Sequence, residues 1–472
     1  MLRPRALRVP RVLCCGPRPC LVCQRRPGVR RFAGGHPYTH RVRSGLLWRR
    51  SATAGGLYLA VAFGILGTIV AARRLGLDGF GLYATVMAAA GFFQTLLDLT
   101  VEESLTKYGF RYVAAEDWGR LRRLFGRALQ VKLGGGVLAM VALAVLAPLA
   151  DAIFDADGLT NPLLVASLLP LVQAPENVGS TALLLRGRYD LRGGFLALSM
   201  GLRLVAILVG ASYGVTETVA LIVVAQVIAT ASVSALGWIA FRRYPAVDAR
   251  SLGDDRHEVV SFVLRSSAAT GMLALRTTFA PLVLGAVAGS TAVGLLRVAQ
   301  APQSGFAAAS SPVRLILLTE QTRDWEHGRE RKVLDGVKRY MLGAAVVAAV
   351  SVPVFMWAMP WLVRVVFGEE YEPAVAAARI VLVAAAVQLV FGWTKSFPVT
   401  IGRPGLRIVA HGIETAVLLP LVAALGAEWG VTGAAWAILA ASVVFAVTWA
   451  FLLVRVRAEV AARALREPAL AP

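Results

Sequence analysis

Residues 133–150 read LGGGVLAMVALAVLAPLA, eighteen residues in a row without a charged side chain. The expected span around them, 129–150, is long enough to cross about 30 Å of hydrocarbon as an α-helix. Comparable apolar runs follow one another along the 472-residue chain, which is 57% hydrophobic and 16% charged, with a mean hydropathy of +0.65. Soluble domains are about half apolar and a quarter charged. We therefore predict an all-α integral membrane protein with twelve spans near 51–72, 82–106, 129–150, 160–185, 191–211, 215–240, 258–288, 291–318, 340–364, 374–398, 406–426 and 430–454.

The formal net charge of +21 would suggest nucleic-acid binding in a soluble protein. Strict alternation of the spans, starting inside, places 40 of the 49 Lys and Arg in inner segments, of which 1–50 and 107–132 are the richest. The outer side holds only Arg73, Arg74 and Arg364. Basic loops stay in the cytoplasm and meet anionic lipid there. The sequence thus predicts a multi-pass protein of the cell membrane with both termini cytoplasmic and no nucleic-acid partner.

The first 47 residues do not resemble the rest of the chain. They are rich in Arg and Pro, contain no acidic residue, and hold all four cysteines. No secretory signal is recognisable, and the Arg-rich composition leaves an organelle transit peptide open. The cysteine spacing lacks a second ligand pair for zinc, so no metal site is expected. We predict a disordered basic tail, or residues translated from a start codon placed too far upstream, over 1–47. A six-helix bundle over 48–241, a cytoplasmic linker over 242–257, a second bundle over 258–456 and a cytoplasmic tail over 457–472 follow it.

Short sequence matches recur at a nearly constant offset, which indicates an internal repeat. Gly81 and Gly294 each lie at the start of a span and are 213 residues apart, and the same offset separates Phe154 from Phe367. Gly-Arg pairs at 187–188 and 402–403, and aromatic-Gly-Val-Thr segments at 213–216 and 429–432, continue the series. Because six spans is an even number, the two halves are parallel, and in transporters the substrate path lies between such halves. The alternative is chance recurrence of Gly and Arg at loop ends.

Several arginines fall within the expected spans, where a charge costs about 2.5 to 3.5 kcal/mol on insertion scales. Arg203, Arg276 and Arg297 lie at central or outer depth, and Arg297 begins a polar stripe with Gln300. An arginine fork stays charged and binds two phosphate oxygens at once. We therefore predict a hydrated, cationic cavity in which Arg203, Arg276, Arg297 and Gln300 bind an anionic, phosphate-bearing substrate. The alternative is that these arginines pair with carboxylates on neighbouring helices.

Four carboxylates also lie within the spans: Asp98, Glu102, Glu176 and Glu414. Asp98 and Glu102 share a predicted helical face with Gln94, since the three are spaced by four residues. Such groups can couple transport to protons or sodium, and structural pairing with the arginines is an equally good reading of them.

No feature of the sequence indicates catalysis. Membrane glycan polymerases and ligases carry a large outer loop, whereas the longest outer loop expected here has about ten residues. Phosphate-binding loops, HExxH and GxSxG motifs are not found. We predict a protein that is not an enzyme and needs no cofactor.

Four segments carry a family resemblance: 71–76 (AARRLG), 79–83 (GFGLY), 366–374 (VFGEEYEPA) and 430–436 (GVTGAAW). In order and placement they resemble the polysaccharide flippases (Wzx-type, O-antigen flippase-like) of the MOP exporter superfamily, over about residues 48–456. The resemblance implies twelve helices in two six-helix bundles that form a V, alternating access, and a cationic cavity between the bundles.

That resemblance implies a flippase of polyprenyl-diphosphate-linked oligosaccharide, which moves it from the inner to the outer leaflet for cell-surface polysaccharide such as the O-antigen of lipopolysaccharide. Membrane lipids, and glycan polymerase or ligase machinery, are the other expected partners. The alternatives are an exporter of another anionic lipid or metabolite, similar to the peptidoglycan-precursor flippase, and a non-transporting membrane scaffold. Buried charges argue against the scaffold, which has no use for their cost.

Overall fold

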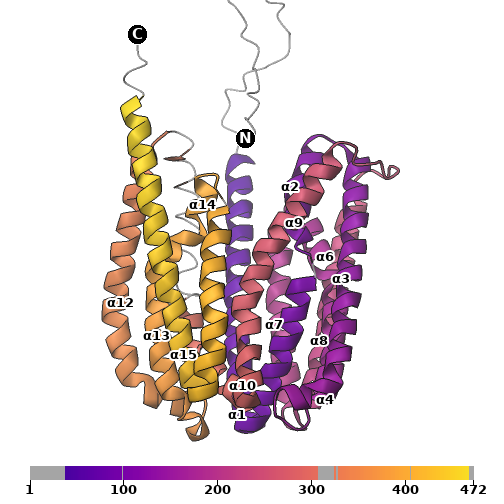
Figure 1. Ribbon diagram of the computed structural model, residues 1–472. Helices are drawn as coiled ribbons and strands as arrows, with labels where there is room; N and C mark the ends of the chain where they lie inside the picture. The colour runs from indigo at the N-terminus through magenta and orange to yellow at the C-terminus, as the bar shows by residue number, and fades with distance from the viewer. Residues whose placement is uncertain are drawn as a thin grey trace, which may run out of the picture. The chain divides into compact units, whose positions relative to one another are not determined.

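The computed structural model describes residues 38–97, 99–306, 321, 324–325, 328–403 and 405–466. Residues 1–47 and 48–472 form two compact units, and the second is described here. Within the described ranges all regular structure is helical (Figure 1). The elements are α1 (Tyr38–Leu97), α2 (Val101–Ala114), α3 (Trp118–Ile153), α4 (Thr160–Ala166), α5 (Leu168–Gln173), α6 (Glu176–Leu185), α7 (Tyr189–Gly210), α8 (Val215–Arg242), α9 (Asp255–Ala274), the π-helix η1 (Leu275–Phe279), α10 (Ala280–Ala299), α12 (Glu330–Val366), the 3-10 helix η2 (Glu369–Tyr371), α13 (Ala374–Val390), the 3-10 helix η3 (Gly392–Lys395), α14 (Phe397–Thr400) and α15 (Gly405–Arg466).

Three of the long helices are broken by a glycine at places where the sequence predicts short loops. Gly76 in α1, Gly289 in α10 and Gly430 in α15 have φ of 70°, 81° and 53°, a region that glycine adopts without steric cost. Seven helices in the described ranges are long and apolar enough to span a membrane, and three of these contain such a break. Each of the three broken helices can cross the membrane twice. Together with α13 and the segmented run α4 to α6, the helices offer twelve crossings, which is consistent with the expected number.

Four expected spans are not continuous helices. In the span over 291–318, α10 ends at Ala299, and residues 307–318 lie outside the described residues. The span predicted over 82–106 ends at Leu97, and α2 starts at Val101 after non-helical residues at 99 and 100, so Gln94 and Glu102 do not share one helical face. The span over 160–185 is divided into α4, α5 and α6, and the span over 374–398 ends at Val390. Pro175 lies between α5 and α6, where it removes a backbone donor.

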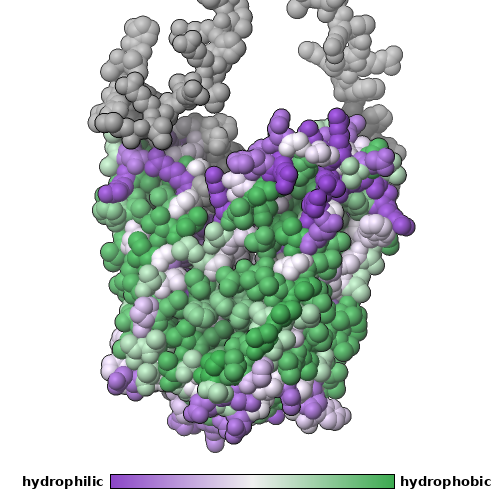
Figure 2. Space-filling model, turned by 45° about the vertical axis from the view of Figure 1, so that its right-hand side comes forward, coloured by the Kyte–Doolittle hydropathy of each residue, from purple (hydrophilic) through white to green (hydrophobic). Residues whose placement is uncertain are grey.

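Figure 2 shows a broad apolar band between two polar ends. Many large apolar side chains of the protein are exposed, among them Val145 at 65% and Trp357 at 85%. An exposed apolar surface of this extent is larger than those found on soluble monomeric proteins. Exposed Trp side chains are frequent where a bilayer meets water. The protein is a multi-pass membrane protein. We call the end that carries loop 243–254 the basic end, and the end that carries Gly76 and Gly289 the opposite end.

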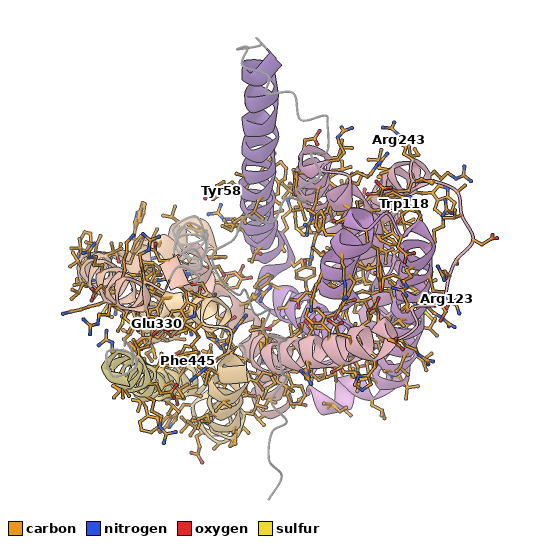
Figure 3. All side chains as sticks on the ribbon, turned by 90° about the horizontal axis from the view of Figure 1, so that it is seen from above. Tyr58, Trp118, Arg123, Arg243, Glu330 and Phe445 are labelled. Carbon is orange, nitrogen blue, oxygen red and sulfur yellow. The ribbon has the colours of Figure 1, made fainter. Side chains whose placement is uncertain are left out.

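The helices form two groups. In Figure 1, α2 to α8 lie on one side and α12 to α15 on the other. Seen from above, Trp118, Arg123 and Arg243 belong to the first group, and Glu330 and Phe445 to the second (Figure 3). The first group comes from the first sequence repeat and the second group from the second repeat, while α1, α9 and α10 belong to neither group.

Residues related by the repeat meet at the opposite end. Thr291 donates a hydrogen bond of 2.9 Å to Asp78, and these positions are 213 residues apart. Gly81 and Gly294, also 213 apart, pack backbone to backbone: a Cβ added at position 294 would lie 3.0 Å from the Gly81 Cα. A contact between equivalent positions is expected only near a common axis. The structure therefore supports the parallel repeat.

Candidate functional site

A cavity that is partly open to solvent lies where the two repeats meet, and its walls enclose about 620 Å³ of space when that open part is included. Helix α1 supplies most of one wall, α7 adds one residue, and η1 and α10 supply the other wall. The lining residues are Thr68, Phe80, Tyr83, Ala84, Met87, Ala88, Arg203, Thr277, Thr278, Pro281, Val293, Leu296, Arg297 and Gln300.

Ten of these fourteen residues form five pairs separated by 213 positions, the offset of the repeat. The pairs are Thr68 with Pro281, Phe80 with Val293, Tyr83 with Leu296, Ala84 with Arg297, and Met87 with Gln300. The cavity is therefore built around the axis that relates the halves, although its chemistry is not symmetric. Each half contributes one cation, from different helices.

Arg203 of α7 and Arg297 of α10 are the charged residues of the lining, which contains no carboxylate. The Arg203 Nη2 lies 3.5 Å from the Tyr83 hydroxyl, at the long limit of a hydrogen bond. Arg297 is exposed, whereas its neighbours from 292 to 296 are buried, so its side chain faces open space within a packed helix. Two cations in one cavity of low dielectric constant attract an anion strongly.

Gln300, predicted with these arginines, lines the same cavity, but Arg276 does not. Arg276 lies in the π-helix, one residue before Thr277, and its Nε is 3.1 Å from the Glu414 Oε1. Glu414 is 1% exposed and its second oxygen lies 3.0 Å from the His411 Nδ1. The structure thus places Arg276 and Glu414 together in an ion pair, as the pairing alternative for these residues requires.

Removing Glu414 is expected to destabilise the protein strongly, because Arg276 would then keep a poorly solvated charge without its carboxylate. We expect Glu414→Ala to lower the free energy of unfolding by about 3 to 5 kcal/mol, as for other buried ion pairs that lose one partner. Thermal unfolding of the purified protein measures this. The double variant Arg276→Ala/Glu414→Ala should lose less than the sum of the single variants, and an additive result would contradict the pair.

The other predicted carboxylates lie apart from the cavity. Glu102 is 3.0 Å from the Lys132 Nζ, and Glu176 accepts a hydrogen bond of 2.7 Å from the Gln226 amide. Asp98 lies outside the described residues. No group of three His, Cys, Asp or Glu suited to a metal ion is found in the part of the chain that the structure describes.

The opposite end of the cavity is closed by contacts that the sequence did not reveal. The Tyr371 hydroxyl lies 2.9 Å from the Ala72 carbonyl oxygen and 3.2 Å from that of Gly76. The Leu77 amide donates to the Glu370 carboxylate at 3.3 Å, and Tyr371 packs edge-on against Phe80 of the cavity wall. Two of the segments that carry the family resemblance, 71–76 and 366–374, therefore meet to form this closure.

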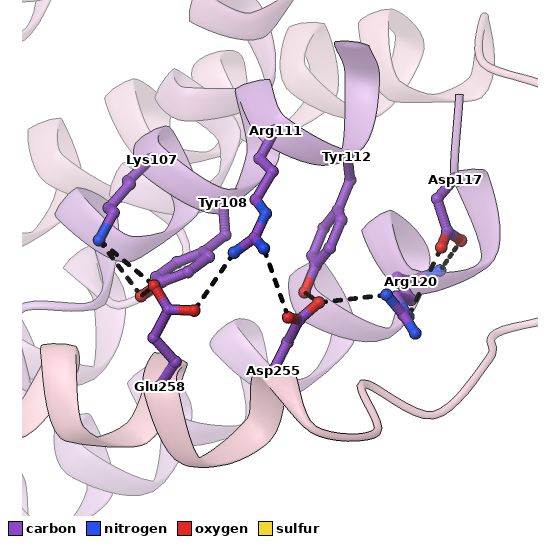
Figure 4. A network of polar contacts seen from close by, with 8 residues as sticks. All are labelled: Lys107, Tyr108, Arg111, Tyr112, Asp117, Arg120, Asp255 and Glu258. Carbon is purple, nitrogen blue, oxygen red and sulfur yellow. Dashed lines mark hydrogen bonds and ion pairs between the residues drawn. The ribbon is translucent and has the colours of Figure 1, made fainter. Parts of the chain in front are cut away.

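The basic end has a polar network that ties α9 to α2 (Figure 4). Asp255 accepts hydrogen bonds from the Tyr112 hydroxyl and from Arg120, and Glu258 accepts from the Tyr108 hydroxyl and from Arg111. Burial, followed by the bond to the carboxylate, raises the pKa of each of these two tyrosines to about 12. Both hydroxyls are therefore protonated donors at neutral pH. Helix α9, which opens the second repeat, is bound at this end to the first.

The sequence model of a family described as polysaccharide biosynthesis protein matches residues 70–376, more than half of the chain. The chain belongs to the polysaccharide biosynthesis protein family. The match covers every cavity-lining residue except Thr68, and both segments that form the closure lie within it. No curated protein matches it.

Solved structures share the fold of this polysaccharide biosynthesis protein. An inward-facing multidrug resistance MATE transporter of the MOP superfamily superposes with a TM-score of 0.67 at 14% identity, over 84% of this chain and 95% of that one. The lipid II flippase MurJ in an inward closed conformation gives 0.64 at 10% identity, over 85% and 87%. A MOP superfamily transporter from Pyrococcus furiosus, described as having a binding pocket of reverse polarity, gives 0.59 at 14% identity, over 88% and 95%.

At such low identities these likenesses show the fold alone. The MOP fold predicted from the sequence motifs is confirmed. The sequence model thus shows the family of the chain, and the solved structures show its fold.

Proposed function

We propose that this protein flips a polyprenyl-diphosphate-linked oligosaccharide from the inner to the outer leaflet of the cell membrane, for the synthesis of a surface polysaccharide such as O-antigen. The observation that carries the proposal is the meeting of Arg203 and Arg297 in one cavity whose lining holds no carboxylate. A diphosphate offers two negative groups to two forked cations. Family membership supports a glycan rather than a drug as the cargo.

In this proposal the basic end faces the cytoplasm, as the distribution of Lys and Arg favours. The closure around Tyr371 then seals the outer side, and the substrate enters from the cytoplasmic side. The diphosphate binds between Arg203 and Arg297, while the lipid tail stays in the bilayer and the glycan occupies the hydrated interior. Opening of the closure releases the cargo outside. The two states must bind the substrate with different affinity for the cycle to have a direction.

A second candidate is an exporter of another anionic lipid. The observation that favours it is the shared fold with the lipid II flippase MurJ, since that protein is named for a lipid cargo. The same two arginines would bind the anionic headgroup in either case. Glycan polymerase or ligase machinery remains the proposed downstream partner.

Deletion of the gene tests the proposal. We expect the lipid-linked oligosaccharide to accumulate on the inner leaflet and surface polysaccharide to be lost. Wild-type protein should restore both, and the variant Arg203→Ala/Arg297→Ala should restore neither, as measured by extracting lipid-linked glycans and staining the surface. Normal surface glycan with no accumulated intermediate would refute this cargo, and accumulation of a different anionic lipid would establish the second candidate.

A further inference from the structure

A lysine is buried inside the first helix bundle, away from the cavity. Lys132 of α3 is 1% exposed, and its Nζ lies 3.0 Å from the Glu102 Oε2 of α2. The sequence assigned this residue to a basic loop, because it precedes the apolar run at 133–150 by one position. Burial of the whole side chain sets it apart from the exposed basic residues Arg123 and Arg127 of the same helix.

A second carboxylate, Glu176, follows a segment that packs against α3 one helical turn from Lys132. One helical turn along α3 from Lys132, Gly136 packs against α5: a Cβ there would lie 3.3 Å from the Cβ of Ala174. Glu176, the first residue of α6, follows Ala174 by two residues. The Glu176 carboxylate accepts from Gln226 of α8, whose amide also donates to Thr230 at 3.0 Å. Helices α2, α3, α6 and α8 thus place one ammonium group and two carboxylates in the same part of the first bundle.

Burying the Lys132 ammonium group is costly even though its partner Glu102 has a side chain that is 36% exposed. The chemistry around it suggests a use. Two carboxylates from separate segments, with an amide and a hydroxyl nearby, are the oxygen ligands that a hard cation prefers. The ammonium group of Lys132 occupies the place of such a cation and balances the negative charge of the carboxylates.

We propose that Lys132 is a built-in cation that fills a cation site formed by Glu102 and Glu176 in the first bundle. The protein then needs no sodium or other metal ion at this site. The positive charge that balances the carboxylates belongs to the Lys132 side chain, so it stays in place throughout the conformational cycle. This inference does not depend on which anion the central cavity carries.

The test removes the ammonium group and asks whether a free cation takes its place. Lys132→Met keeps a long side chain without the charge. Purified protein in detergent, without substrate, is heated in NaCl, LiCl or choline chloride at equal ionic strength and about pH 8, where isolated carboxylates are ionised. We expect the melting temperature of the wild type to be the same in all three salts. The melting temperature of Lys132→Met should fall by several degrees in choline chloride and rise again with sodium or lithium concentration, as a bound ligand requires.

The matched control is Glu102→Gln/Lys132→Met, which removes one charge of each sign. It should melt above Lys132→Met in choline chloride and respond less to sodium. If Lys132→Met does not fold and the double variant does, charge compensation is still supported. A sodium-dependent melting temperature of the wild type, or a folded Lys132→Met that melts identically in all three salts, would overturn the proposal. None of these readouts uses transport, so they stand apart from the test of the proposed function.

Discussion

Replacing Arg297 with alanine is expected to abolish most transport without lowering stability. A charge-assisted hydrogen bond to a phosphate contributes about 1.5 to 3 kcal/mol, which corresponds to about a 10- to 150-fold loss of affinity. Arg203 and Arg297 share a cavity without a carboxylate among its lining residues, so the two cations repel each other in the empty protein. Removing one relieves that repulsion. We therefore expect Arg297→Ala to lower the rate of flipping by about 10- to 100-fold, while its melting temperature stays equal to that of the wild type or rises.

Two further variants sharpen this result. Arg297→Lys keeps the charge and loses the two-pronged geometry, so its rate should lie between those of the wild type and Arg297→Ala. Arg379→Ala is the matched control, because Arg379 is exposed and donates to the Met356 carbonyl oxygen outside the cavity. Flipping is measured in vesicles with a fluorescent polyprenyl-diphosphate glycan. A fall in stability in step with the fall in rate would assign Arg297 a structural role instead.

The long apolar runs and the glycine-marked turns are the parts of the fold that sequence predicts well. Span length is dictated by bilayer thickness, and Gly76, Gly289 and Gly430 lie where a break needs positive φ. The helix breaks at 99–100 and within α4 to α6 could not be predicted from the sequence. They depend on tertiary partners, such as the Ser267 hydroxyl that accepts from the Thr100 amide at 2.9 Å, and no local pattern announces such a partner.

The candidate site, like the fold, was only partly predictable from the sequence. Depth in the membrane was enough to bring Arg203, Arg297 and Gln300 to one cavity, because residues at equal depth on the inner walls converge. Depth could not separate Arg297 from Arg276, since only the facing helix decides that Arg276 meets Glu414. Lys132 was missed because it borders a basic segment, and burial there is set by the packing of α2 and α6 around it. The apolar residues on either side of it, at 131 and 133, were the feature of the sequence that could have indicated its burial.

Gly81→Ala is expected to open the closure at the opposite end. A Cβ at position 81 would lie 2.7 Å from the Ser290 carbonyl oxygen and 2.9 Å from the Thr291 Cα, closer than real Cβ contacts. Both neighbours are backbone, so the two helices must move apart. Overpacking of this kind costs about 1 to 3 kcal/mol, and here the cost falls only on the closed state. The population should therefore shift about 5- to 150-fold towards a state open at this end.

Labelling of a cysteine in the cavity measures that shift. Val293 lines the cavity and is 2% exposed, so Val293→Cys reports access from the opposite end once the four cysteines at positions 14, 15, 20 and 23 are replaced by serine. A membrane-impermeant maleimide added outside the cell should label it faster in Gly81→Ala. Gly134→Ala is the control, because a Cβ at that helix position meets nothing within 4 Å and the labelling rate should not change. Equal labelling in both variants would mean that the glycine contact does not hold the closure shut, and the hydrogen bonds of Tyr371 would then have to carry it alone.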